Sequence, residues 1–92
     1  MQLIIEIKSH LNLYYDMLSL YQLGNNVSAT IEIMSINDHA KVRLSEMCVM
    51  VGTTIRMIKK TPFGGPVQIK VNNYYLAIRK EDAINIMVKV ND

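Results

Sequence analysis

The segment from Val67 to Ile78 constrains the fold most, because apolar side chains alternate regularly on both sides of Asn72-Asn73. Asn tolerates the left-handed backbone that a two-residue hairpin turn requires. Such a turn would place apolar residues opposite one another on one face: Val71 with Tyr74, Ile69 with Leu76 and Val67 with Ile78. A shift by one residue would turn all of these side chains to the other face. We therefore predict an antiparallel hairpin with this register.

Three further segments alternate with the same period of two and are predicted to form strands. They are Val27–Ile33, Thr53–Lys59 and Ile84–Val90. The inward faces are expected to be Val27, Ala29, Ile31 and Ile33 in the first, and Ile84, Ile86, Val88 and Val90 in the last. Two prolines and two glycines make residues 61–66 a loop. Five short strands of this kind favour a mainly β fold, a small closed or nearly closed barrel.

Two short helices interrupt the strands. Asn37 or Asp38 can cap a helix N-terminus, and Ala40, Leu44 and Met47 follow at helical spacing. This helix is expected to end near Cys48. The run Arg79–Ala83 breaks the alternation and predicts a tight helical turn.

The N-terminal segment has a different pattern. Its apolar residues recur at steps of three and four, which is helical spacing: Leu3, Ile7, Leu11, Tyr14, Leu18 and Tyr21. We expect a helix within residues 6–18, although β-branched Ile4 and Ile5 also permit an extended start. Residues 1–17 are thus predicted to be an extension and residues 18–92 the barrel domain. An apolar stripe without a partner favours a homo-oligomer formed through the extension.

Composition and charge narrow the function. The single cysteine excludes an intramolecular disulfide, and no stretch offers the about 20 apolar residues of a membrane span. We therefore expect a cytoplasmic protein. Residues 41–80 hold eight Lys or Arg against one Glu, whereas both flanks are acidic. Such a basic block favours attraction of an acidic partner, although outward Lys and Arg on a small barrel also serve solubility.

Catalytic and metal-binding patterns are weak. Cys48 and His39 are nine residues apart, or about 13 Å along a helix, too far for a nucleophile and its base. Cys48 is expected to be a small half-buried residue. For a metal, only the adjacent Asp38 and His39 come close to a ligand pair, and they are weak candidates. We predict no enzyme activity, no cofactor and no metal site.

The order of these motifs resembles the FeoA family, the small cytoplasmic component of prokaryotic ferrous iron uptake. The resemblance covers about residues 18–90. It rests on Arg43-Leu44 and Met47 in the helix, Gly52 before a strand, Pro62-Phe63-Gly64-Gly65-Pro66 in the loop, and Arg79-Lys80-Glu81-Asp82-Ala83 before the last strand. It implies an SH3-like barrel that acts on FeoB, the membrane GTPase and iron permease, at the cytoplasmic face of the membrane.

Three positions depart from the family pattern. Cys48 stands where the family usually has Gly, which suits a left-handed helix end better than a residue with a Cβ. Val51 stands where Pro is usual, so the connection to the next strand is expected to differ in shape. Gly65 replaces a common Asp.

Apolar residues on predicted loops are the candidates for binding FeoB, because exposed apolar side chains either pack or bind. The turn Val49-Met50-Val51 with Met47 is one such surface, and Pro62 with Phe63 is another. Arg79 adds positive charge. For Phe63 a second interpretation stands beside the first, that its ring plugs an open end of the barrel.

The alternative function is a small basic barrel, unrelated to iron, that binds nucleic acid or another protein. The hairpin register places Tyr75 on the outer face beside Lys70. A stacking platform for single strands needs several aromatic rings. One ring is too few, so nucleic acid is not the expected partner.

Overall fold

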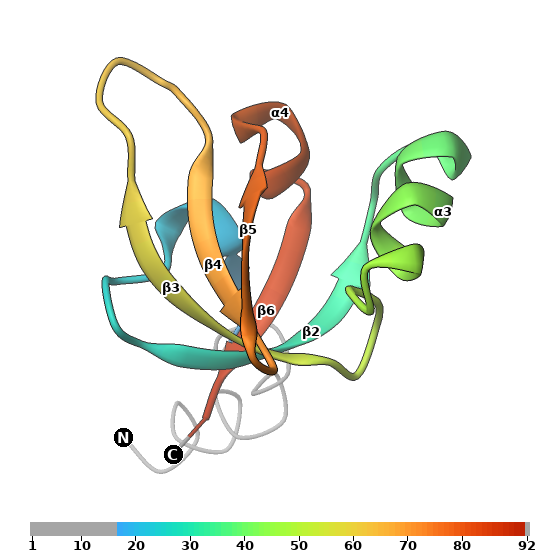
Figure 1. Ribbon diagram of the computed structural model, residues 1–92, viewed down its shortest axis with the longest axis horizontal. Coiled ribbons are helices and arrows are strands. Elements are labelled where there is room, and N and C mark those ends of the chain that lie inside the picture. The colour runs from blue at the N-terminus through green and yellow to red at the C-terminus, as the bar shows by residue number, and fades with distance from the viewer. Residues whose placement is uncertain (1–16, 92) are drawn as a thin grey trace, which may run out of the picture.

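A computed structural model describes residues 17–91 (Figure 1). One antiparallel sheet of six strands, in the order β1-β6-β2-β3-β4-β5, curls around the core. The strands are β1 (Met17–Ser19), β2 (Ser28–Met34), β3 (Thr54–Lys60), β4 (Val67–Val71), β5 (Tyr74–Ile78) and β6 (Ile86–Val90). The helices are the 3-10 turn η1 (Leu20–Gln22), α3 (Asp38–Glu46) and α4 (Lys80–Ala83). The mainly β barrel with a short helix is therefore confirmed. No helix among residues 17–91 is long and apolar enough to span a membrane.

The hairpin of β4 and β5 has the predicted register. Val71 lies opposite Tyr74, and Val67 lies opposite Ile78. Asn72 adopts the left-handed conformation, with φ 53°. Val67, Ile69 and Val71 are fully buried, so the alternation that predicted the strand also fills the core.

The spacing predicts a helix within residues 6–18, but residues 17 and 18 are not helical. They form β1, which pairs with β6, so that Met17 lies opposite Lys89 and Leu18 opposite Val88. The strand ends at Ser19, whose hydroxyl accepts a hydrogen bond of 3.2 Å from the Gln22 amide. The Gln22 side chain accepts one of 3.0 Å in return and completes a capping box around η1. The rest of the predicted helix, and the predicted self-association, lie outside the described residues.

A β-bulge in β2 corrects the predicted inward face of that strand. The register with β6 shifts between Ile31 and Ile33. Ile31 is fully buried, but Ile33 is 43% exposed and the next residue, Met34, is only 8% exposed. The extra residue of a bulge reverses which side chains point to the core.

The last strand also begins later than predicted. Ile84 belongs to the end of α4, with φ −70° and ψ −16°, and its side chain is exposed. Val90 at the far end of β6 is exposed as well. The inward face of β6 is therefore formed by Ile86 and Val88, both fully buried.

Helix α3 begins and ends as predicted. The Asn37 side chain accepts a hydrogen bond of 2.8 Å from the Ala40 amide and caps the N-terminus. Ala40 and Leu44 are buried, Leu44 belongs to the core, and Met47 is half-buried beside it. Cys48 follows in the left-handed conformation, with φ 64°.

Candidate partner-binding site

A groove of about 490 Å³ lies in the angle between the end of β2 and α3. The turn that follows α3 closes its third side. Its walls are formed by Glu32, Ile33, Met34, Lys41, Val42, Ser45, Val49, Met50 and Val51. Strand, helix and turn thus each contribute side chains to one concave surface.

The groove collects the exposed apolar side chains of this part of the molecule. Ile33, Val42, Met50 and Val51 are 43%, 58%, 44% and 59% exposed. They are four of the eight large apolar side chains that are exposed among residues 17–91. Apolar side chains gathered in one hollow are typical of a binding site, whereas single exposed ones are common on any surface.

Two local backbone features create this apolar lining. The bulge in β2 turns Ile33 outward. The left-handed Cys48 reverses the chain, so that Val49 is fully buried while Met50 faces solvent. The Thr53 hydroxyl holds the turn, because it donates to the Cys48 carbonyl at 3.1 Å and accepts from the Met50 amide at 3.3 Å.

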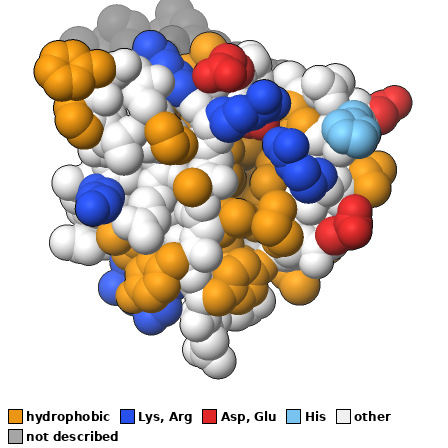
Figure 2. Space-filling view, turned by 45° about the horizontal axis from the view of Figure 1, so that its top comes forward, with side chains coloured by type: hydrophobic (Ala, Val, Ile, Leu, Met, Phe, Trp, Pro, Cys, Tyr) orange, Lys and Arg blue, Asp and Glu red, His pale blue; other side chains and the backbone are white. Residues whose placement is uncertain are grey.

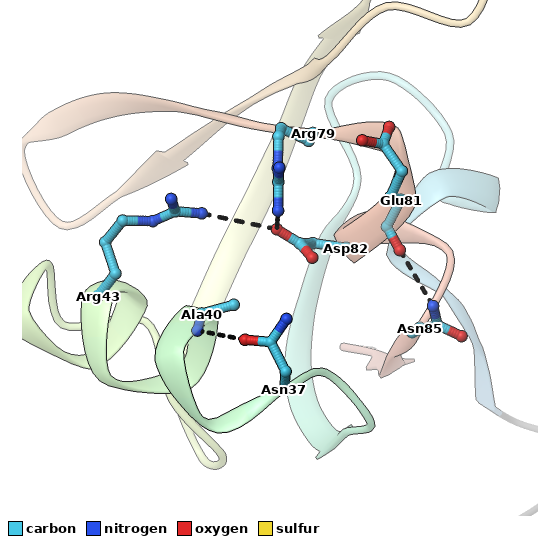
Figure 3. A network of polar contacts seen from close by, with 7 residues as sticks. All are labelled: Asn37, Ala40, Arg43, Arg79, Glu81, Asp82 and Asn85. Atoms are coloured by element: carbon cyan, nitrogen blue, oxygen red, sulfur yellow. Dashed lines mark hydrogen bonds and ion pairs between the residues drawn. The ribbon is translucent and has the colours of Figure 1, made fainter.

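Charges of both signs stand at the groove, since Glu32 and Lys41 belong to its lining. The stronger electrostatic feature lies on the neighbouring surface (Figure 3). There the buried Asp82 of α4 accepts a hydrogen bond from Arg79 at 3.3 Å and faces Arg43 of α3 at 3.7 Å. This carboxylate joins two helices that the sequence separates by more than thirty residues.

The predicted partner-binding residues do not form one surface. Met50 lines the groove, and Met47 is half-buried beside the core. Val49 has no exposed surface, so it supports the groove from beneath and offers no direct contact. Pro62 and Phe63 lie in the β3–β4 loop, away from α3 (Figure 1).

Phe63 does not plug the barrel. Its side chain is 105% exposed, so it packs against nothing among residues 17–91. Arg79 is also exposed, although its guanidinium is held by Asp82.

Sequence reasoning missed Ile33 and Val42 as groove residues. Val42 carried a signal, because it is an apolar residue on α3 outside the buried stripe of Ala40 and Leu44. Ile33 carried none, because only the bulge places it on the outside.

The residues considered for catalysis or metal binding do not come together in one site; they are Asp38, His39 and Cys48. Asp38 and His39 are exposed in the first turn of α3, and Cys48 lies beyond its other end. Cys48 is exposed, not half-buried as predicted, because the left-handed turn directs it to solvent. Within residues 17–91, no three His, Cys, Asp or Glu side chains come close enough to share a metal ion.

Lys70 and Tyr75 lie side by side on the outer face of the hairpin, as predicted. The Lys70 ammonium lies 5.7 Å from the centre of the Tyr75 ring.

At the β3–β4 loop, a Cβ built on Gly65 would collide with the Thr61 hydroxyl. The present conformation of Thr61 therefore excludes the Asp that is common in the family at this position.

The fold defines a small SH3-like domain, and the groove is its candidate binding surface. A family model described as the FeoA domain matches residues 18–90, so the chain belongs to the FeoA family. A search of curated proteins gave no match.

Solved structures share this fold, and two of them are described as FeoA or iron(II) transport protein A. One is a crystal structure described as an iron uptake regulatory protein, FeoA, with 25% identity, a TM-score of 0.71 and coverage of 82% of this chain and 97% of that one. Another is the solution structure of iron(II) transport protein A from Clostridium thermocellum, with 27% identity, a TM-score of 0.73 and coverage of 79% and 45%. A manganese-dependent transcriptional repressor, 14% identical, shares the fold over 82% of this chain and 42% of its own, with a TM-score of 0.71.

Proposed function

We propose that this chain is an accessory protein of ferrous iron uptake that binds the cytoplasmic part of the FeoB membrane GTPase–permease through the groove. Membership of the FeoA family supports the role in iron transport. The gathering of Ile33, Val42, Met50 and Val51 in one groove carries the choice of surface. The protein itself would stay at the cytoplasmic face and would act by binding, without catalysis.

An apolar segment of the partner fits this groove best. A half-exposed aliphatic side chain contributes about 1 kcal/mol when a partner covers it completely. The four apolar side chains would thus supply most of the binding free energy, and the charged Glu32 and Lys41 would orient the partner. Binding alters the activity of FeoB only if one FeoB conformation is bound more tightly than another.

Substitutions that keep the net charge test the groove. We expect Val42→Ser and Met50→Ser each to weaken binding of the purified cytoplasmic part of FeoB about tenfold in a titration. Ile84→Ser is the matched control, because Ile84 is exposed to the same degree as Met50, 45% against 44%, but lies outside the groove. Its binding should equal that of the wild type.

Two results would overturn the proposal. The first is a wild-type chain that fails to bind FeoB at low and at high salt. The second is wild-type affinity in both groove variants, with far-UV circular dichroism showing that they are folded.

A further inference from the structure

Phe63 stands at the tip of the β3–β4 loop, which projects from the end of the barrel (Figure 1). Its side chain is 105% exposed, more than any other large apolar side chain of residues 17–91. Apolar side chains protrude at the corner of the molecule that this loop forms (Figure 2). A completely exposed ring contributes nothing to the core, so the stability of the fold does not explain it.

The left-handed backbone at the tip of the loop is also unfavourable for an aromatic residue. Phe63 and Gly64 have φ values of 61° and 74°, and the Gly65 amide donates to the Pro62 carbonyl at 3.4 Å. This is the geometry of a turn with two left-handed residues, where Asn and Gly are preferred and a bulky side chain is strained. Strained residues of this kind cluster at functional sites, and no helix end accounts for this one, as it does for Cys48.

The loop is held firmly at its base. The Thr61 amide and hydroxyl both donate to the Pro66 carbonyl, at 3.1 Å and 2.8 Å. Pro62 and Pro66 further restrict the backbone on either side of the tip. Phe63 is therefore presented on a closed and stiff loop.

Two basic side chains, Lys60 and Lys80, lie at the base of this loop. The ammonium groups of Lys60 and Lys80 lie 5.7 Å and 5.3 Å from the centre of the Tyr21 ring. Lys80 also reaches Gly64, since a Cβ built there would lie 3.6 Å from its ammonium nitrogen. Residues 47–80 hold six Lys or Arg and no Asp or Glu.

We infer that the β3–β4 loop is a membrane contact, in which Phe63 enters the interface of a bilayer and the lysines at its base bind anionic lipid headgroups. An exposed ring with two long basic side chains at the base of its loop matches the layers of such a bilayer, apolar inside and negative at the surface. A protein hot spot would instead need a cluster of apolar neighbours around the ring. Phe63 has only Pro62 and two glycines beside it.

The loop and the groove lie on different parts of the molecule: Figure 1 shows the β3–β4 loop at the upper left and α3, which lines the groove, at the right. A chain that contacts lipid through Phe63 keeps its groove free for a protein partner. The inference is independent of the proposed function, because vesicles alone test it.

Fluorescence tests the insertion directly, because the chain contains no tryptophan. Phe63→Trp supplies a single reporter at the tip of the loop. We expect its emission to shift to shorter wavelength with vesicles of phosphatidylcholine and phosphatidylglycerol at low salt, and brominated lipid to quench it. Tyr75→Trp is the control, because Tyr75 is exposed near the β4–β5 turn at the other end of β4 and should show no shift.

Flotation with the same vesicles measures how much the Phe63 ring and the two lysines each contribute to membrane binding. Phe63→Ala should lower the partition constant for binding to the vesicles about tenfold. Lys60→Gln and Lys80→Gln should each lower it about fivefold, because each lysine acts near an anionic surface. Val42→Ala, in the groove, should leave it unchanged.

Three outcomes would overturn the inference. They are no binding to anionic vesicles, equal binding to vesicles of phosphatidylcholine alone, and unchanged binding after Phe63→Ala. Loss of FeoB binding by Phe63→Ala together with no vesicle binding would instead assign Phe63 to a protein pocket.

Discussion

The main-chain amide of Val49 donates a hydrogen bond of 2.9 Å to the carbonyl oxygen of Leu44 and closes the C-terminal end of α3. The Cys48 amide donates to Ser45 at 2.9 Å inside this loop. The two bonds form a Schellman motif, and the side chains of Leu44 and Val49 both belong to the core. The motif requires a left-handed residue at Cys48, whose φ is 64°.

Glycine at this position should stabilise the protein. Cys48→Gly removes the Cβ that opposes the left-handed conformation, and we expect a gain of about 1 kcal/mol in the free energy of unfolding. For a domain of this size, that corresponds to about 4–8 °C in Tm. Chemical denaturation and thermal melts measure it.

Cys48→Ala separates the backbone effect from loss of the thiol, because alanine keeps the Cβ. The alanine variant should melt close to the wild type. A glycine variant no more stable than the alanine variant would show that Cys48 is unstrained.

The sequence was sufficient to predict the structure where its apolar pattern allows only one arrangement. Between Val67 and Ile78 only one register places the alternating apolar side chains of both strands on the same face, and the structure has that register. The spacing of Ala40 and Leu44 likewise fixed the buried face of α3. The resemblance to the FeoA family pointed to Cys48 as a position suited to glycine, and its φ is indeed positive.

The sequence was insufficient where distant pairing decides the structure. Three residues of β1 have too little pattern to indicate a strand, and they form one because β6 offers them its free edge. The bulge in β2 follows from its pairing with β6 and not from the alternation of Ile31 and Ile33. The groove depends on this bulge, so it could not be predicted as a surface.

The bulge predicts losses of stability of different size for substitutions at two neighbouring residues, Met34 and Ile33. Met34→Ala should lower the free energy of unfolding by about 2–3 kcal/mol, because a buried side chain leaves a cavity. Ile33→Ala should cost less than about 1 kcal/mol, because its side chain is already 43% exposed. Urea denaturation of both variants measures the difference. The reverse order would place Ile33 in the core and remove the bulge.

The buried carboxylate of Asp82 should contribute to stability through Arg79 and Arg43. Asp82→Asn keeps the shape of the side chain but leaves two guanidinium groups facing each other without an anion. Both arginines are more than half exposed, so we expect a modest loss of about 1 kcal/mol. Glu81→Gln is the matched control, because Glu81 lies on the same helix and is exposed. Equal stability of the two variants, in denaturant at low salt, would argue against the network.

The loop tip should show that Phe63 is kept at the expense of stability. Phe63→Gly relieves the left-handed strain at φ 61° and removes no packing contact, so the protein should become more stable by about 1 kcal/mol while it loses binding to anionic vesicles. Phe63→Ala keeps the Cβ and should lose vesicle binding without the gain in Tm. Thermal melts and flotation of the two variants therefore separate strain from lipid contact. A lower Tm for the glycine variant would mean that the ring stabilises the folded chain, and its exposure would then need no functional explanation.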